Sequence, residues 1–153
     1  MTLLRITAII CAGFLLSGQS SEESDLDSAF PKDTLIISAD EHACYFFDIY
    51  VASTRAQQMR GLMHVRNLPE MTGMIFSYRR AGTRSMWMKN TYIPLDLVFI
   101  HADGRIANIV VNAEPHSLNS RVAAEPVNYV LELNGGVTEK LSIDSDSLVL
   151  LMQ

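Results

Sequence analysis

Two acidic residues lie within apolar stretches of this sequence, where a charged side chain needs a partner. Asp96 and Glu132 each stand between two leucines. A carboxylate with apolar neighbours is tolerated when it is paired with a cation or hydrogen-bonded. Two such groups could act as the general acid and base of a hydrolase, if burial raised the pKa of one and a neighbour kept the other ionised. In the alternative interpretation, each is a structural acid whose hydrogen bonds fix the fold without any chemistry.

The segment Met86–Asp96 combines large apolar and polar side chains and contains the only tryptophan of the chain. In an extended conformation, Trp87 and Lys89 would share one face and Asn90 would lie on the other. A strand buried in a core would not mix apolar and polar groups on both faces. Pro94 lacks a backbone donor and disfavours helix at the preceding residue, so we expect the chain to turn there and continue as a second extended piece.

These polar and aromatic residues are typical of a ligand site, which combines apolar area with a few placed polar groups. We predict a pocket formed by Trp87, Lys89, Asn90 and Asp96, with Glu132 as a candidate second wall. The hypothesis requires Trp87 to be accessible and a pocket to adjoin Lys89. The alternative is that Trp87 belongs to the core and that Lys89 only neutralises Asp96.

The sequence carries no recognisable motif for nucleophilic catalysis or metal binding. It has no serine nucleophile elbow, phosphate-binding loop or Cys–His pair at a known spacing. The four histidines are too scattered to predict a metal site, and no cofactor is expected. Cys44 opens an apolar segment and is expected to be a small buried residue. We therefore favour a binding or accessory role, with an unidentified small molecule or protein as partner, over an enzyme.

The chain of 153 residues suits a single domain with a substantial apolar core. Its formal net charge is -5 and it has no long basic block, which argues against nucleic acid as a partner. Arg79, Arg80 and Arg84 form a local positive patch, which is expected to be solvated surface.

The N-terminus has the composition of an export signal. Arg5 precedes a short apolar run and small residues up to Ser20, so we expect residues 1–20 to be a cleaved signal peptide. The apolar run is shorter than the roughly 20 residues of a membrane-spanning helix. Residues 21–33, rich in Ser and acidic side chains, are expected to form a flexible tether, and residues 34–153 the domain. These features predict an exported, periplasmic or other extracytoplasmic protein with no membrane span after cleavage, tethered to the membrane if the leader is retained.

The hydrophobic periodicity predicts an α+β fold that is mainly antiparallel β. A Thr-x-x-Gln capping box precedes one clear helix, at about residues 55–63. The turn Asp103-Gly104 between two apolar runs is a strong hairpin signal. The polar segment 112–125 is long enough for a lid over the site. About seven short strands at hairpin spacing predict a small curled sheet or open barrel. These strands are expected at about residues 35–37, 44–52, 73–78, 97–100, 106–111, 129–133 and 147–151.

Several blocks of the sequence are similar to those of a known family. They are Gly61-Leu62-Met63, Leu68-Pro69, Gly73-Met74-Ile75-Phe76, the run from Trp87 to Asp96, and the run from Tyr129 to Gly136. In these blocks the chain resembles domain-of-unknown-function family 192, from about Cys44 to Leu151. The resemblance implies a small, compact, β-rich domain of bacteria and archaea that is often exported. It implies no activity, ligand or cofactor.

Overall fold

A computed structural model of the protein describes residues 21–39 and 43–151. The predicted signal peptide, residues 1–20, lies outside the described residues. Within them, three short helices accompany nine strands, and no helix is long and apolar enough to cross a membrane. In chain order the elements are α1 (Ser21–Ala29), β1 (Lys32–Ser38), β2 (Cys44–Ala52), α2 (Arg55–Arg60), β3 (Thr72–Gly82), β4 (Ser85–Met86), β5 (Leu95–Ile100), β6 (Ile106–Ala113), β7 (Arg121–Val122), β8 (Val127–Asn134), α3 (Val137–Lys140) and β9 (Leu148–Leu151).

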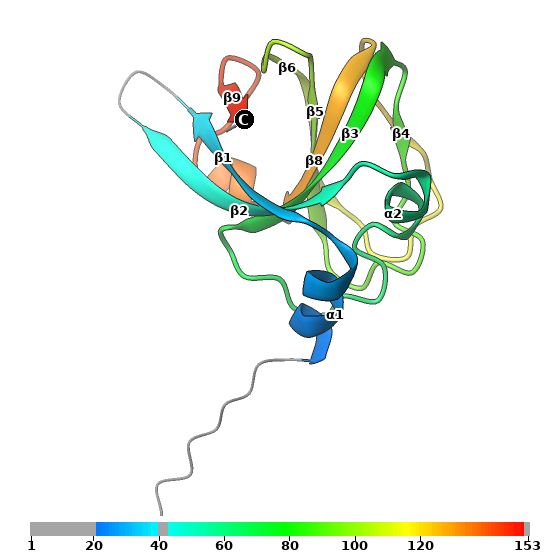
Figure 1. The fold of residues 1–153 in the computed structure, drawn as a ribbon. Coiled ribbons are helices and arrows are strands. Elements are labelled where there is room, and N and C mark those ends of the chain that lie inside the picture. The colour runs from blue at the N-terminus through cyan, green and yellow to red at the C-terminus, as the bar shows by residue number, and fades with distance from the viewer. Residues whose placement is uncertain (1–20, 40–42, 152–153) are drawn as a thin grey trace, which may run out of the picture.

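Seven strands form one curled sheet, a half-barrel with the strand order β6-β5-β8-β3-β2-β1-β9 (Figure 1). Neighbouring strands are antiparallel except β2 and β3, which run parallel. The prediction of an α+β fold with a mainly antiparallel, curled sheet is therefore confirmed. A parallel pair needs a long crossover connection. Here the crossover is residues 53–71, which include α2.

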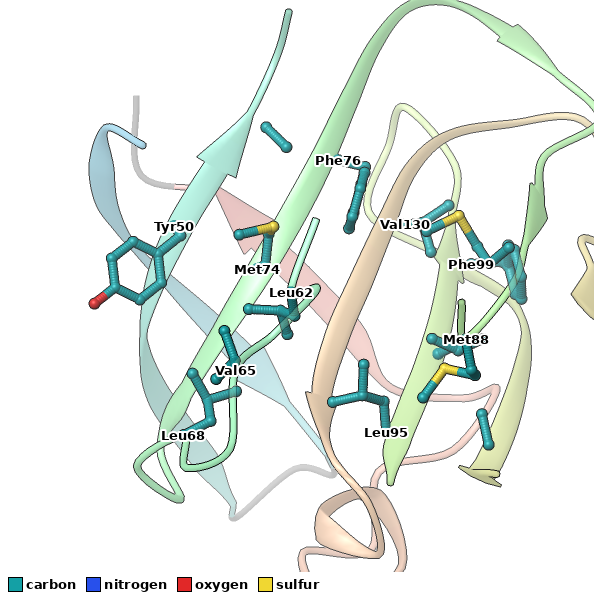
Figure 2. Packing of buried hydrophobic residues seen from close by; sticks show 14 of the residues in the cluster. Tyr50, Leu62, Val65, Leu68, Met74, Phe76, Met88, Leu95, Phe99 and Val130 are labelled. Carbon is teal, nitrogen blue, oxygen red and sulfur yellow. The ribbon is translucent and has the colours of Figure 1, made fainter. Parts of the chain in front are cut away.

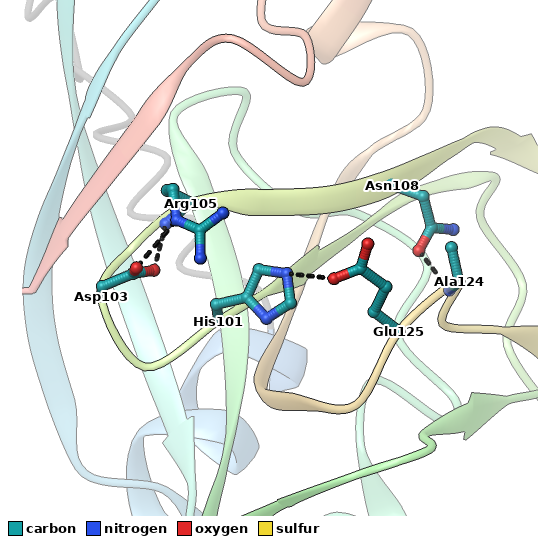
Figure 3. Close-up of polar contacts among 6 residues, drawn as sticks. All are labelled: His101, Asp103, Arg105, Asn108, Ala124 and Glu125. Carbon is teal, nitrogen blue, oxygen red and sulfur yellow. Dashed lines mark hydrogen bonds and ion pairs between the residues drawn. The ribbon is translucent and has the colours of Figure 1, made fainter.

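The predicted hairpin turn also joins the two ends of the sheet. β5 and β6 pair antiparallel around it, and the Asp103 carboxylate accepts hydrogen bonds from the backbone and side chain of Arg105 (Figure 3). The backbone N–H of Val149, in β9, donates to the carbonyl of Gly104 over 2.9 Å. A Cβ at Gly104 would lie 2.1 Å from the Val149 carbonyl oxygen, and φ there is +87°. This closure therefore requires glycine.

Apolar side chains cover both faces of the sheet, which explains why all six residues of β5 are buried. On the face that we call inner, every strand of the half-barrel contributes to one cluster: Leu35, Ile37, Phe47, Ile49, Ile75, Val98, Ile100, Ile106, Leu131, Leu133 and Val149. On the outer face, strand residues pack against the connections that cross them (Figure 2). This outer cluster includes Tyr50, Met74, Phe76, Leu95, Leu97, Phe99 and Val130 from strands and Leu62, Val65, Leu68 and Met88 from connections.

Helix α1 differs from the expected flexible tether. Leu26 and Phe30 are buried in the outer cluster, and the carboxylate of Asp25 lies 2.5 Å from the guanidinium of Arg60 in α2. β1 also begins at Lys32, inside the segment expected to be unstructured. The composition of this segment is polar, but two apolar residues four positions apart form one helical face and dock it on the sheet.

Helix α2 begins where the sequence predicts and ends early. The Thr54 side chain accepts a hydrogen bond from the backbone N–H of Gln57 at 3.3 Å, and the Gln57 side chain accepts one from the Thr54 N–H at 3.0 Å. This capping box confirms the start of the helix. The helix ends at Arg60 rather than at 63, because Gly61 adopts φ 50° and ψ -141°.

The polar segment 112–125 packs along β4 and the residues that follow it. Its strand β7 pairs with β4, and the backbone N–H of Met88 donates to the carbonyl of Ser117 over 2.9 Å. At the other end, the N–H of Ala124 donates to the side-chain oxygen of Asn108 over 2.8 Å (Figure 3). The segment is thus held in place by backbone pairing along much of its length.

Candidate functional site

Asp96 is a fully buried hydrogen-bond acceptor that holds three elements together. Its Oδ1 accepts from the backbone N–H groups of Asn112 and Gly136, at 2.8 and 2.9 Å. Its Oδ2 accepts from the N–H and the hydroxyl of Thr138, at 2.9 and 2.7 Å. Four donors satisfy a carboxylate that is 0% exposed, with no cation needed. Asp96 therefore ties the end of β6 and the start of α3 to β5, and Lys89 is not its partner.

Glu132 is also buried, but one of its oxygens lacks a partner. The residue is 4% exposed, and Oε2 has no hydrogen-bond partner among the described residues. Burial raises the pKa of Glu132 to about 8, because removal from water disfavours the charged form. At neutral pH the carboxyl is therefore mainly protonated and can donate a hydrogen bond as well as accept one.

The two carboxyl groups lie on neighbouring strands but on opposite faces of the sheet. Asp96 pairs with Leu133 across β5 and β8, and Leu97 pairs with Glu132. Paired residues share a face, and successive residues alternate between faces. Asp96 thus lies on the inner face and Glu132 on the outer one. With the sheet between them, they share no cleft in which a paired acid and base could act on one substrate.

A pocket of about 100 Å³ lies on the outer face at Glu132. Glu132 of β8 and Phe76 and Tyr78 of β3 form its sheet side. The other walls are residues 58–63 of the crossover and residues of the segment 85–91. Trp87 and Lys89 belong to that second wall, and Trp87 is 53% exposed, so it stands at the rim. The structure therefore brings Trp87, Lys89 and Glu132 to one pocket, whereas Asn90 and Asp96 do not line it.

The segment that follows β4 is a turn and not the extended stretch that we expected. The backbone N–H of Thr91 donates to the carbonyl of Met88 over 3.1 Å, and Asn90 has a positive φ of 56°. Met88 is fully buried in the outer cluster. The turn keeps Trp87 and Lys89 together at the surface, with Lys89 Nζ 5.3 Å from the centroid of the Trp87 ring.

Gly61 forms a part of the pocket wall close to Glu132. A Cβ at this position would lie 3.1 Å from Phe76 Cζ and 4.0 Å from Glu132 Oε2, and φ is +50°. Glycine therefore allows the crossover to pass close to the sheet, and any side chain here would occupy space beside the carboxyl.

The charged groups around the pocket are mainly cationic. Lys89 has no carboxylate within ion-pair distance among the described residues. Arg60 also lines the pocket, but its guanidinium is paired with Asp25. Tyr78 stays neutral because burial raises its pKa, and the guanidinium of Arg84 lies 3.8 Å from the centroid of its ring. At neutral pH the pocket thus combines positive charge with a neutral acid.

A second polar cluster lies around Tyr92, outside the pocket. The Tyr92 hydroxyl is 3.1 Å from His64 Nδ1, and its ring centroid is 5.0 Å from that of His116. Both histidines have positive φ, 68° and 61°. No group of three or more His, Cys, Asp or Glu side chains in the described part of the chain could hold a metal ion.

Two residues near the surface were not anticipated from the sequence in their observed roles. Cys44, expected to be buried, is exposed, because alternation along β2 turns Phe47 and Ile49 inward and the even-numbered positions near Cys44 outward. Tyr78 was not recognised as part of the site. Part of the signal was present, because alternation along β3 puts Met74, Phe76 and Tyr78 on one face. The pairing of Met74 with Glu132 is known only from the structure.

The comparisons with known proteins place the chain in a family. It matches the model of DUF192, described as "Uncharacterized ACR", over residues 35–151, and it belongs to that family. A crystal structure from Sinorhizobium meliloti 1021, named as a "putative transcription regulator", is 35% identical with a TM-score of 0.77 and covers 78% of this chain and 93% of its own. A protein of unknown function from Novosphingobium aromaticivorans DSM 12444 is 34% identical with a TM-score of 0.76, covering 80% of this chain and 86% of its own. The comparison with curated proteins found no match.

Proposed function

We propose that this protein binds a small ligand, or one end of a larger one, in the pocket between Trp87, Lys89 and Glu132. The observation that carries the proposal is the buried Oε2 of Glu132 at this pocket, which has no hydrogen-bond partner in the part of the chain that the structure describes. Buried polar groups are nearly always hydrogen-bonded, and leaving one without a partner costs about 1–3 kcal/mol. A ligand that supplies the missing hydrogen bond recovers this free energy.

The composition of the pocket supports the same proposal. Trp87 provides a large exposed aromatic surface, and Lys89 provides a cation that no carboxylate among the described residues neutralises. This mixture of apolar area and a few placed polar groups is what small-molecule sites use. A volume of about 100 Å³ is small beside the roughly 300–1,000 Å³ of pockets that hold drug-sized ligands. Only a small group can therefore enter, and the rest of a larger ligand would lie across Trp87.

The proposal places this binding outside the cytoplasm. It is supported by the composition of residues 1–20, where a single Arg precedes a short apolar run and small residues. Expression of the full chain followed by cell fractionation tests this part. A mature species in the periplasmic or external fraction, with an N-terminus near residue 21 by mass spectrometry, is the expected result. Recovery of the intact chain in the cytoplasm only would contradict it.

Catalysis and nucleic-acid binding are not proposed. Asp96 and Glu132 lie on opposite faces of the sheet, so they do not form a paired-carboxylate site. The formal net charge of -5 disfavours binding to a polyanion.

The fluorescence of Trp87, the only tryptophan, tests the pocket directly. We expect acrylamide to quench its emission readily, and a ligand from a panel of small acids, amines, sugars and short peptides to protect it. Lys89→Ala should weaken the protection, whereas Lys140→Ala, which removes an exposed lysine paired with Glu70 elsewhere on the surface, should not. An emission that neither quencher nor any compound alters would place Trp87 in the core and contradict the proposal.

A further inference from the structure

We infer that the pocket binds a carboxylate group, carried by a free small organic acid or by a peptide C-terminus. This inference rests on the proposed function and names the chemical class of its ligand. Lys89 supplies the countercharge at the rim, and the Glu132 carboxyl donates a hydrogen bond to one of the ligand's oxygens.

The position of the Glu132 carboxyl indicates that the ligand supplies a hydrogen-bond acceptor. Its Oε2 is buried beside the pocket and has no hydrogen-bond partner in the described part of the chain. A protonated carboxyl needs an acceptor, and an ionised carboxylate is the strongest acceptor that a small ligand offers. Gly61 leaves the approach to this oxygen free of a side chain, since even a Cβ there would come within 4.0 Å of Oε2.

The charges around the pocket select an anion over a cation. Lys89 and Arg60 line it, and Glu132 is the only acidic residue among the residues that line it. A ligand ammonium would meet Lys89 at close range without a compensating anion, whereas a ligand carboxylate would be attracted. Lys89 is available to pair with a ligand carboxylate, because its ammonium lies over the Trp87 ring and contacts no carboxylate of the described residues.

The size of the pocket limits what enters it. A volume of about 100 Å³ is well below the roughly 300–1,000 Å³ of the pockets that hold drug-sized ligands, so a small group such as a carboxylate suits it. A free acid of this size would fit entirely, and a peptide would insert its C-terminus and extend over Trp87.

The mechanism makes binding dependent on pH in a defined direction. The other titratable or charged residues that line the pocket with Glu132 are Lys89, Arg60 and Tyr78. They come from the segment 85–91, the crossover and β3, and the guanidinium of Arg84 lies against the Tyr78 ring. Because the pKa of Glu132 is about 8, the donor is present below that pH and is lost above it. The affinity should be constant near pH 6.5 and about tenfold lower at pH 9.

Titration of Trp87 fluorescence at these two pH values tests the inference. The ligands are acetate, propionate and N-acetylglycine, each matched with its methyl ester or amide, and an N-acetylated dipeptide with a free or an amidated C-terminus. We expect binding only by compounds with a free carboxylate. Preference for the simple acids or for the free dipeptide then identifies which of the two sources the pocket accepts.

Two substitutions separate the roles of the residues. Glu132→Gln keeps a neutral donor that does not titrate, so binding should persist at pH 6.5 and no longer weaken at pH 9. Lys89→Gln should reduce the affinity by about tenfold at both pH values and keep the pH dependence. Lys140→Gln is the control and should leave both the affinity and its pH dependence unchanged.

Different failures overturn different statements. If esters or amides bind as well as the acids, or if affinity rises with pH, the carboxylate inference is wrong and ligand binding in the pocket stands. If neither these compounds nor the panel of small acids, amines, sugars and short peptides changes the emission or quenching of Trp87, the inference and the proposed function both fail.

Discussion

Asp96 and Glu132 occupy adjacent strands one residue out of register, and the sheet separates their carboxyl groups. Asp96 accepts four hydrogen bonds, whereas Oε2 of Glu132 accepts none from the described residues. Two acidic residues that each stand between two leucines therefore have opposite effects on the stability of the folded protein. Asp96 stabilises the fold, and Glu132 costs stability in a way that ligand binding would explain.

Replacing Asp96 with Ala should destabilise the protein by about 3–5 kcal/mol, because three backbone N–H groups and one hydroxyl lose their acceptor in the interior. Urea denaturation should show a lower midpoint with an unchanged slope. Thr138→Val removes one of the four hydrogen bonds, that from the hydroxyl, and should cost about 1 kcal/mol. A wild-type midpoint for Asp96→Ala would contradict the structural role.

Glu132→Gln should stabilise the protein at alkaline pH and change little near pH 4. The pKa of Glu132 is raised from 4.5 to about 8, so the folded state retains its proton where the unfolded chain has lost it. The stability that this retained proton gives the folded state is fully present below about pH 4.5. Between there and about pH 8 the free energy of unfolding falls by about 1.4 kcal/mol per pH unit, and the contribution is then lost. Urea denaturation at pH 5, 6.5, 8 and 9 measures the difference in unfolding free energy between wild type and Glu132→Gln. Parallel curves for the two proteins would show that Glu132 does not titrate this way.

Gly61→Ala should lower stability by about 1–3 kcal/mol and weaken ligand protection of Trp87. The new Cβ must adopt φ +50° and would lie 3.1 Å from the Phe76 ring, which adds backbone strain to a close contact. Gly82→Ala is the matched control, because its Cβ meets only the end of the Arg84 side chain, at 3.3 Å. Its thermal midpoint should stay close to wild type. Equal midpoints for the two variants would argue against strain at Gly61.

Phe30→Ala should destabilise the protein by about 3–4 kcal/mol, since a large buried side chain is lost from the outer cluster. Asp25→Ala removes only a solvent-exposed ion pair and should cost less than about 1 kcal/mol. Denaturant midpoints of the two variants distinguish a docked helix from a tether. If Phe30→Ala were as stable as wild type, the segment would be a tether after all.

Local signals in the sequence predicted much of the fold. The bounds of β2, the β5–β6 hairpin and the start of α2 follow from alternation, an Asp-Gly turn and a capping box, all encoded within a few residues. The parallel pairing of β2 with β3 could not be predicted this way. It depends on how residues 53–71 cross the sheet, which is a matter of long-range packing.

The site was predictable in part for the same reason. The only tryptophan, in a segment that mixes apolar and polar groups, and the acid between two leucines identified Trp87, Lys89 and Glu132, which line one pocket. The sequence could not separate Asp96 from Glu132, because the register of β5 against β8 decides whether they share a face. A shift of one residue would pair them directly and put both carboxyl groups on the same face. Nor could it locate Arg60, which reaches the pocket only through the path of the crossover.

The pocket draws its two halves from different kinds of structure, since β3 and β8 supply one side and the connections 58–63 and 85–91 supply the other. The inner cluster that keeps the half-barrel together contains no residue of either connection. The connections also contribute Leu62 and Met88 to the outer cluster, so only their exposed positions are independent of the interior. Changes at those exposed positions would alter the pocket and leave both buried clusters as they are.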